Sequence, residues 1–243
     1  MKSATRIGIY GAAGRMGGRL TACAQNIPEI DVVATIDREQ RSGDFSMCDV
    51  VVDVSVADAT GGLIDALHGC TAALVTGVTG RNAEQTASIH DEISRRAVFI
   101  AANFSVGIAV LNRLVAEAAK ALGETYDIEV LELHHRKKAD APSGTALQLA
   151  ETAADSAGLR WPEARRVRDG MTGPRQRAEL GTAALRGGTV VGEHTVYFFG
   201  DSERIELTHR ATDRDVFAHG ALRAARWVSD QKPGRYGMSD LLG

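Results

Sequence analysis

Hydrophobic residues in the first hundred positions gather in short runs separated by segments of helical periodicity. The runs lie at 6–10, 32–36, 50–54, 72–78 and 98–101, and the first is followed by Met16, Leu20 and Ala24 at helical spacing. Apolar strands that alternate with helices are typical of a parallel sheet covered on both faces, because each crossover helix buries one stripe against the strands. We therefore predict an α/β fold with a Rossmann-like, doubly wound parallel sheet.

The pattern changes after residue 104. Residues 106–122 predict a long amphipathic helix, 126–135 an extended segment and 145–157 another helix, while 180–186, 189–199 and 204–209 alternate as antiparallel strands do. Gly187-Gly188 and Gly200-Asp201-Ser202 are plausible hairpin connections. We expect a dinucleotide-binding domain at 1–104, completed by a C-terminal segment 214–243 that contains a last helix at 216–229. Residues 105–213 then form a second α+β domain with an open mixed sheet.

A glycine-rich turn joins the first predicted strand to the first helix. Gly11, Gly14 and Gly17 allow a tight turn and let a pyrophosphate approach the N–H groups at the start of the helix. Asp37 ends the second strand 20 residues beyond Gly17, where an acidic side chain typically binds a ribose hydroxyl. The pattern favours dinucleotide binding, and the alternative is a structural turn without a ligand. Arg38 could accommodate a 2′-phosphate that Asp37 would repel, so NADH and NADPH both remain open.

Composition and charge exclude several classes of protein. The 243 residues carry a formal net charge of -3, which argues against a generally basic nucleic-acid binder. No apolar run approaches the roughly 18 residues that a membrane span needs, so a cytoplasmic chain without a membrane partner is expected. Cys23, Cys48 and Cys70 lack the spacing of a zinc site and are interpreted as reduced packing residues.

Residues 134–145 read HHRKKADAPSGT and lead into the predicted helix. Ser143 is a natural N-cap, and the N–H groups that follow it could hold an anionic carboxylate. A histidine in a cleft can donate a proton near neutral pH. His134 and His135 point to opposite sides of an extended run, which makes joint metal chelation awkward, and we expect no metal. Taken alone, the segment could also be a solvated basic loop.

The stretch ELHHRKKADAPSGT resembles the signature of the 4-hydroxy-tetrahydrodipicolinate reductase (dihydrodipicolinate reductase) family, usually written E-x-H-H-x-x-K-x-D-A-P-S-G-T. Further resemblances are GAAGRMG at 11–17, TGVTG at 76–80, AANFSVG at 101–107 and GEHT at 192–195, so they span nearly the whole chain. The chain departs from the family pattern at Ala13, at Val78 and in a short segment between Arg38 and Asp49.

The resemblance implies an NAD(P)H-dependent reductase of lysine and diaminopimelate biosynthesis that takes 4-hydroxy-tetrahydrodipicolinate to tetrahydrodipicolinate. It also implies a cytoplasmic homotetramer that binds a small dicarboxylate substrate. By position, the catalytic residues are His134 and Lys138. The substrate-binding residues are His135, Lys138, Ser143, Gly144 and Thr145. The cofactor-binding residues are Gly11, Ala12, Ala13, Gly14, Arg15, Met16, Asp37, Arg38, Gly77, Val78, Thr79, Ala101, Ala102, Asn103 and Phe104.

Two other functions remain open from the sequence. One is a nucleotide-sensing Rossmann protein without catalysis, whose basic loop binds a partner, and the other is a two-domain dehydrogenase acting on a different small acid. A short-chain dehydrogenase is disfavoured, because none of the four tyrosines is followed by a lysine four residues later.

Overall fold

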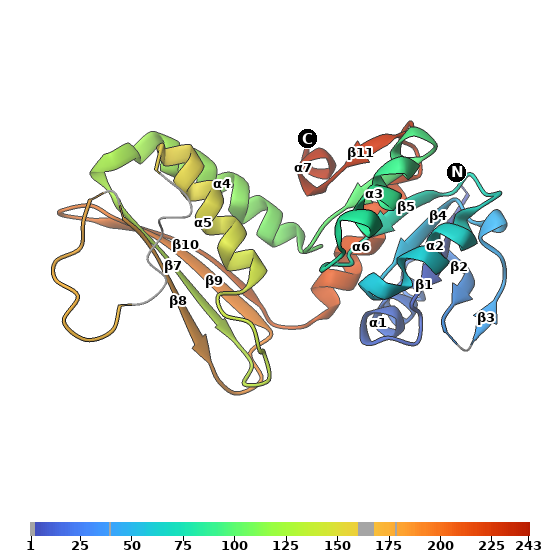
Figure 1. Ribbon diagram of the computed structural model, residues 1–243, viewed down its shortest axis with the longest axis horizontal. Helices are drawn as coiled ribbons and strands as arrows, with labels where there is room; N and C mark the ends of the chain where they lie inside the picture. The colour runs from blue at the N-terminus through green and yellow to red at the C-terminus, as the bar shows by residue number, and fades with distance from the viewer. Residues whose placement is uncertain (1–2, 39, 160–167, 178) are drawn as a thin grey trace. The chain divides into compact units, whose positions relative to one another are not determined.

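The computed structural model describes residues 3–38, 40–159, 168–177 and 179–243, which fold into two compact units (Figure 1). The first unit comprises Met1–Val106 and Asp215–Gly243, and the second comprises Gly107–Arg214. Within these described ranges, no helix is both long enough and apolar enough to cross a membrane.

The first unit is built on a seven-stranded sheet with the order β11-β6-β5-β4-β1-β2-β3. Every neighbouring pair is parallel except β2 with β3. Its strands are β1 (Thr5–Tyr10), β2 (Ile30–Ile36), β3 (Arg41–Ser42), β4 (Val50–Asp53), β5 (Ala73–Thr76), β6 (Ala97–Ile100) and β11 (Gly234–Tyr236). Its helices are α1 (Arg15–Ala24), α2 (Thr60–Leu67), α3 (Ala83–Asp91), α6 (Asp215–Val228) and α7 (Met238–Leu242).

The central strands of this sheet, β4, β5 and β6, are buried on both faces, as their unbroken hydrophobic runs predict. In β4, Val50 and Val52 belong to the core that α1 and α6 cover, whereas Val51 belongs to the core under α2 and α3. All three side chains are fully buried. The predicted doubly wound parallel sheet is therefore confirmed, and its two cores account for the lack of alternation in the strands.

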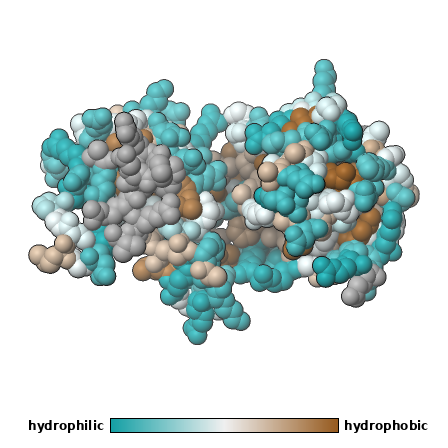
Figure 2. All heavy atoms as spheres, in the orientation of Figure 1, coloured by the Kyte–Doolittle hydropathy of each residue, from teal (hydrophilic) through white to brown (hydrophobic). Residues whose placement is uncertain are grey.

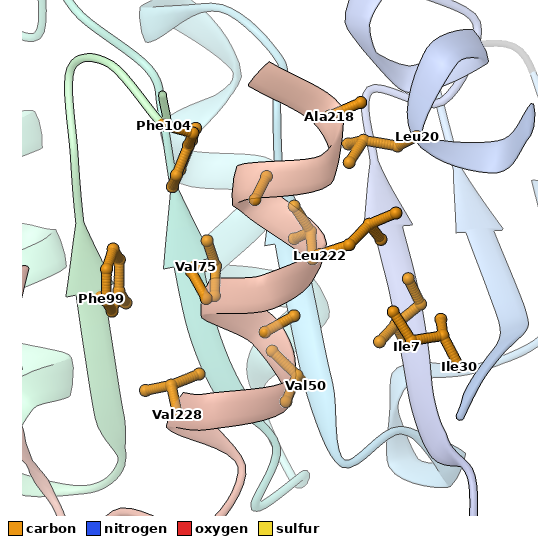
Figure 3. Packing of buried hydrophobic residues seen from close by; sticks show 14 of the residues in the cluster. Ile7, Leu20, Ile30, Val50, Val75, Phe99, Phe104, Ala218, Leu222 and Val228 are labelled. Carbon is orange, nitrogen blue, oxygen red and sulfur yellow. The ribbon is translucent and has the colours of Figure 1, made fainter. Parts of the chain in front are cut away.

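Helix α6 comes from the C-terminal part of the chain and packs against the sheet that contains β1 and β4. Figure 3 shows Leu222 of α6 among the strand residues Ile7, Val50 and Val75, all within one buried cluster. The same helix also passes close to the segment after β6, and it carries Gly220 at the point of approach. A Cβ at Gly220 would lie 1.8 Å from the carbonyl oxygen of Phe104.

The second unit has a four-stranded mixed sheet with the order β10-β9-β7-β8, covered on one face by two helices. Its strands are β7 (Asp127–His134), β8 (Leu180–Arg186), β9 (Gly192–Phe199) and β10 (Arg204–Ala211). Its helices are α4 (Val106–Leu122) and α5 (Gly144–Ala157). Within the described ranges, short 3-10 helices lie at Phe45–Met47, Ala57–Ala59, Glu92–Ser94 and Gly123–Thr125.

One of the two hairpins predicted for this sheet is correct and the other is wrong. β9 and β10 pair as an antiparallel hairpin whose turn begins at Gly200, where the Gly200 N–H donates to the Glu203 carbonyl at 2.9 Å. The turn at Gly187-Gly188 makes no hairpin, because β8 and β9 lie on opposite sides of β7 and β8 is parallel to it. Alternation shows that a segment is a strand, but it does not select the strand's neighbour.

The visible face of the molecule is mainly hydrophilic. Figure 2 shows hydrophobic residues there in small groups between hydrophilic ones. Several large hydrophobic side chains are nevertheless exposed, including Leu114 at 50% and Leu185 at 54%.

The close approach of α6 gives a test of the packing in the first unit. Gly220→Ala should lower the free energy of unfolding by about 1–3 kcal/mol, because a methyl group cannot fit against the Phe104 carbonyl. The matched control is Gly61→Ala in α2, where a Cβ would meet no atom within 4 Å. It should stabilise by roughly 0.5–1 kcal/mol through helix propensity. Thermal unfolding of both variants checks this, and a Gly220→Ala protein as stable as the parent would contradict the packing.

Candidate active site

The glycine-rich turn of the first unit is shaped by close backbone contacts. Gly11 has a φ of +88°, and a Cβ there would lie 2.8 Å from the Ser55 backbone. A Cβ at Gly17 would lie 2.4 Å from the Gly11 carbonyl oxygen. Gly14 is the N-cap of α1, which has no side-chain cap and no acidic residue in its first turn. Such a helix start offers its N–H groups and the positive end of its dipole to a phosphate, so the turn fits a dinucleotide.

Asp37 ties this turn to the end of β2. Its carboxylate accepts from the Ala13 N–H at 2.5 Å and from the Arg38 N–H at 2.8 Å. The contact to residue 13 uses a backbone N–H group, so alanine can make it as glycine would. The Arg38 side chain is exposed beside it.

Two pockets of the first unit run along this edge of the sheet and share Val54 and Ser55. The first is lined by Tyr10, Gly11, Gly14, Asp37, Arg38, Val54, Ser55, Val56, Asp58, Ala59 and Gly62. The second is lined by Met16, Val54, Ser55, Gly77, Val78, Ala102, Asn103, Phe104 and Phe217. Parallel strands end at a common edge, which is why turns distant in sequence meet there.

Ten of the fifteen expected cofactor residues line these two pockets. The other five, which do not line them, are Ala12, Ala13, Arg15, Thr79 and Ala101. Ala101 is buried in the core, and Ala12 packs against that core. Val54 and Ser55 were not predicted from the sequence. They directly follow β4, and β4 is seen to lie beside β1 only when the strand order is known.

A buried ion pair supports the second pocket from behind. Arg81 donates to the Asp53 carboxylate at 2.6 Å, and the two side chains are 8% and 0% exposed. The same guanidinium donates to the Val78 carbonyl at 3.3 Å, and the Ser55 hydroxyl donates to Asp53 at 2.6 Å. The Asp53–Arg81 pair thus holds two segments that line the second pocket, one at Ser55 and one at Val78. At Val78 the contact is made by the backbone carbonyl and not by the side chain.

The second candidate site lies in the second unit, at the end of β7. Burial alternates along this strand, so Glu132 and His134 share the buried face with Ile128 and Val130. Glu132 Oε2 lies 2.5 Å from His134 Nδ1. An ionised carboxylate can only accept, so the Nδ1 proton belongs to the imidazole and Nε2 is left for other contacts. A Cβ at Gly192 would lie 3.0 Å from that Nε2, and glycine leaves room for the ring.

Glu132 is fully buried and accepts hydrogen bonds from three directions. Arg186 of β8 donates to both of its oxygens at 2.8 Å. The Ser143 N–H donates to Oε1 at 3.0 Å. These contacts join β7, β8 and the start of α5 around one carboxylate, and the fork of the guanidinium matches its two oxygens.

Ser143 begins α5 as the sequence predicts. Its hydroxyl accepts from the Ala146 N–H at 3.2 Å, which is the expected N-cap bond, and lies 3.1 Å from His194 Nε2. Gly144 and Thr145 form the first turn of this helix, and a Cβ at Gly144 would meet no atom within 4 Å. The helix start therefore has open space at the residue where a carboxylate is expected.

The basic residues after β7 lie at different depths. Lys138 is partly buried, and its Nζ is 2.9 Å from an oxygen of the exposed Asp140. His135 is also partly buried, and its Nδ1 has no hydrogen-bond partner within the described part of the chain. Arg136 and Lys137 are exposed. The structure thus brings His134 and Ser143 together through Glu132 and leaves two residues of the basic run in solvent.

His194 of β9 was not among the expected site residues, although the GEHT resemblance includes it. Its ring packs edge-on against His134 with centroids 5.2 Å apart. Burial lowers the pKa of His194 to about 4, and the neighbouring His134 adds to this effect. His194 is therefore neutral at physiological pH.

Burial also governs the charge of the other groups in this site. It lowers the pKa of His134, and the Glu132 carboxylate opposes it without cancelling it. Burial by itself would raise the pKa of Glu132, but the hydrogen bonds from Arg186, His134 and Ser143 outweigh it and keep this pKa low. The site thus combines an ionised carboxylate with a histidine that gives up its proton readily.

Glu132 and Arg186 were missed as site residues by sequence reasoning. The signal for Glu132 was present, because alternation in the segment 126–135 places a carboxylate at a core position two residues before His134. Arg186 has no comparable signal, since its role depends on which strand lies beside β7.

Comparison with known proteins matches both halves of the chain to one family. The family model described as "Dihydrodipicolinate reductase, N-terminus" matches residues 5–104, and "Dihydrodipicolinate reductase, C-terminus" matches residues 107–242. The chain is 42% identical to a 4-hydroxy-tetrahydrodipicolinate reductase of Acinetobacter baumannii, over 100% of this chain and 98% of that protein. It is 44% identical to the corresponding protein of Myxococcus xanthus, over 97% of this chain and 88% of that one.

Among solved structures, the fold is similar to a dipicolinate-bound dihydrodipicolinate reductase from Paenisporosarcina sp. TG-14. The TM-score is 0.77 at 21% identity, over 98% of this chain and 99% of that chain. A protein from Thermotoga maritima described as a "probable dehydrogenase" has a TM-score of 0.60 at 14% identity, over 97% of this chain and 92% of that chain. At these identities, the two structures compare in fold alone.

The low pKa of His194 predicts how stability depends on pH. In the unfolded chain a histidine binds its proton near pH 6.5, but His194 in the folded protein does so only near pH 4. Between these values only the unfolded state is protonated, so the free energy of unfolding should fall as pH falls from 6.5 to 4. The contribution of this group is on the order of 3 kcal/mol and does not grow below pH 4.

Denaturant unfolding at a series of pH values checks this, with NMR titration of the His194 ring. His134 and His209, whose pKa values burial also lowers, act in the same direction. In His194→Gln the slope over this range should therefore be reduced but not abolished. A His194 ring that titrates near pH 6.5 would contradict the buried, neutral state.

Proposed function

The chain belongs to the dihydrodipicolinate reductase family and reduces 4-hydroxy-tetrahydrodipicolinate, and we propose that the second unit holds this substrate while His134 supplies the proton. The strongest support is that the family motif from Glu132 to Thr145 folds around one buried carboxylate, with His134 bound to it and Ser143 opening α5. The full-length likeness to reductases of known name supports the same assignment.

The first unit is the NAD(P)-binding domain. When bound, the reduced nicotinamide supplies a hydride to the substrate. We assign its phosphates to the turn at Gly11–Met16, the adenosine ribose to Asp37 and Arg38, and the remainder of the cofactor to the pocket lined by Gly77, Val78 and residues 102–104. The open helix start and the carboxylate placed beside it support this assignment.

The substrate is a dicarboxylate, and the second unit offers it several groups. We assign one carboxylate to the positive end of α5, where the N–H groups of Gly144 and Thr145 would donate to it. Lys138 adds a cation, whose Nζ lies 2.9 Å from Asp140. His135 adjoins His134, and among the described residues its buried Nδ1 has no hydrogen-bond partner.

The proton-transfer step follows from the state of His134. Reduction adds one hydride at C4 of the unsaturated cyclic imine that remains when the substrate loses water, and one proton completes the product. Charge driven into the conjugated ring is neutralised by a proton from His134 Nε2, because Nδ1 is bound to Glu132. Lys138 stabilises the same developing charge.

These roles predict a difference between His134→Gln and Lys138→Ala. The first should lower kcat by roughly 10²- to 10⁴-fold, the usual worth of general acid catalysis, with little effect on binding of pyridine-2,6-dicarboxylate. The second should weaken that inhibitor by about 1.5–3 kcal/mol, since it removes a charge-assisted hydrogen bond. Oxidation of NADH or NADPH, with substrate generated from pyruvate and aspartate semialdehyde, measures both. Turnover of His134→Gln within about twofold of the parent would remove His134 from the mechanism.

The Asp37–Arg38 pair predicts opposite effects on the two cofactors. Asp37→Ala should weaken NADH more than NADPH, because the carboxylate binds a 2′-hydroxyl and repels a 2′-phosphate. Arg38→Ala should do the reverse. Fluorescence titration gives the four dissociation constants, with Asp31→Ala as a control, since Asp31 is exposed at the far end of β2. Equal losses for both cofactors in both variants would show that neither residue reads the 2′ position.

We also propose a cytoplasmic homotetramer, as the family resemblance implies, formed through the sheet of the second unit. On the face turned away from α4 and α5, Tyr197 and Phe199 stack at 5.4 Å and Leu185 is 54% exposed. A sheet face with exposed aromatic and aliphatic side chains is a surface that a second copy can bury.

Analytical ultracentrifugation tests this association. The parent should sediment as four copies of the 25.8 kDa chain. Leu185→Glu should shift it toward smaller species, because it places a charge in the proposed interface. Leu114→Glu is the matched control, since Leu114 is equally exposed but lies on α4. A parent protein that sediments as a monomer would contradict the proposal.

A further inference from the structure

The charges around His134 come from several elements and balance one another. Glu132 of β7 carries a negative charge and Arg186 of β8 a positive one, and the two form a bidentate pair. Lys138 and Asp140 form a second pair in the loop after β7. His194 of β9 packs on the ring of His134 without charge, and His209 of β10 lies opposite His194 in the sheet.

We propose that Glu132 and Arg186 are positioning residues for the reductase reaction: Glu132 keeps the His134 proton on Nδ1, and Arg186 offsets the carboxylate charge so that Nε2 can release its proton. This inference rests on the role of His134 given under the proposed function. Neither residue contacts the reacting atoms, and both act through the histidine.

Proton release from His134 requires both Glu132 and Arg186. An unbalanced carboxylate buried 2.5 Å from an imidazole would hold the imidazolium strongly, and such a group is a poor proton donor near neutral pH. Arg186 is bound to both oxygens of this carboxylate and donates also to the Asp140 carbonyl at 2.6 Å. Its position is therefore fixed by backbone as well as by Glu132, and it cancels the charge without displacing the Nδ1 bond.

Burial supports the same view of the pair. Glu132 is 0% exposed, and the Arg186 side chain is only 21% exposed. Burying two charges costs free energy that a pair of apolar residues would not need. If the two residues only stabilised the fold, a packed apolar pair would do so at a lower cost in free energy. Control of the protonation of a neighbouring histidine requires charge.

The proposal predicts shifts in opposite directions for two variants. Glu132→Gln preserves shape and can still accept from Nδ1–H, but it leaves Arg186 uncompensated, so His134 should lose its proton at lower pH. Arg186→Met leaves the carboxylate uncompensated, so His134 should keep its proton to higher pH. Arg186→Lys retains the charge and should stay close to the parent. A charge within 4–6 Å typically moves such a titration by about 1–3 pH units.

The experiment measures kcat against pH at saturating substrate and cofactor, with NMR titration of the His134 ring in the same proteins. The His134 signal is identified by its absence from His134→Gln. The limb on which activity falls as pH rises should move down by about one pH unit or more in Glu132→Gln, and up in Arg186→Met. The charge control is Glu151→Gln, an exposed carboxylate on α5, which should not move it.

Several outcomes would overturn the proposal. One is a shift of both variants in the same direction, and another is loss of kcat with an unchanged pH profile, which a merely structural role would give. If Arg186→Met fails to fold, Glu132→Gln and Arg186→Lys still decide, because only the first should shift the titration. If His134→Gln retains turnover, the proposed function fails, while the NMR titration of His134 still tests the charge balance.

Discussion

A buried carboxylate must be surrounded by donors, and at Glu132 this requirement ties the second unit together. Its partners are a guanidinium from β8, an imidazole from its own strand and the backbone N–H that opens α5. Removing any one of them would leave a charge or a lone pair unsatisfied in a core position. His134 and the start of α5 are thus fixed by the same carboxylate, which is why one sequence motif can contain both.

The first unit uses the same principle at a different edge. Asp53 is fully buried at the end of β4, and Arg81 joins it to the segment that begins at Gly77. Here the charged pair supports pocket walls rather than a reactive group. In both units, polar segments between elements are held by a buried ion pair that lies behind candidate site residues.

Most of the fold follows from local patterns in the sequence. Unbroken apolar runs predicted most strands of the parallel sheet, and alternation predicted β8, β9 and β10. The segment 126–135 was predicted as extended and forms β7, and Ser143 predicted the start of α5. The short strand β11 was missed, because three residues carry no periodicity and pair only through β6. The turn at Gly187-Gly188 was assigned to the wrong connection, since strand order depends on contacts between distant segments.

The residues of the candidate site could be predicted from the sequence to about the same extent as the fold. The family motif predicts His134, Lys138 and the residues after Ser143 as site residues, and alternation contains the signal that places Glu132 beside His134. The sequence contains no such signal for Arg186, because a single arginine at a strand end is usually solvated and its partner Glu132 is 54 residues away. At Ala13 and Val78, where the chain departs from the family pattern, the hydrogen bonds to Asp37 and Arg81 are made by backbone groups.

The substrate-binding groups proposed around His134 can be observed in a crystal structure with NADH and pyridine-2,6-dicarboxylate. One carboxylate should lie within hydrogen-bond distance of the Gly144 and Thr145 N–H groups and of Lys138 Nζ. His134 Nε2 should face the ring while Nδ1 stays on Glu132. A dicarboxylate bound away from α5, or a His134 ring turned so that Nε2 contacts Glu132, would contradict this account.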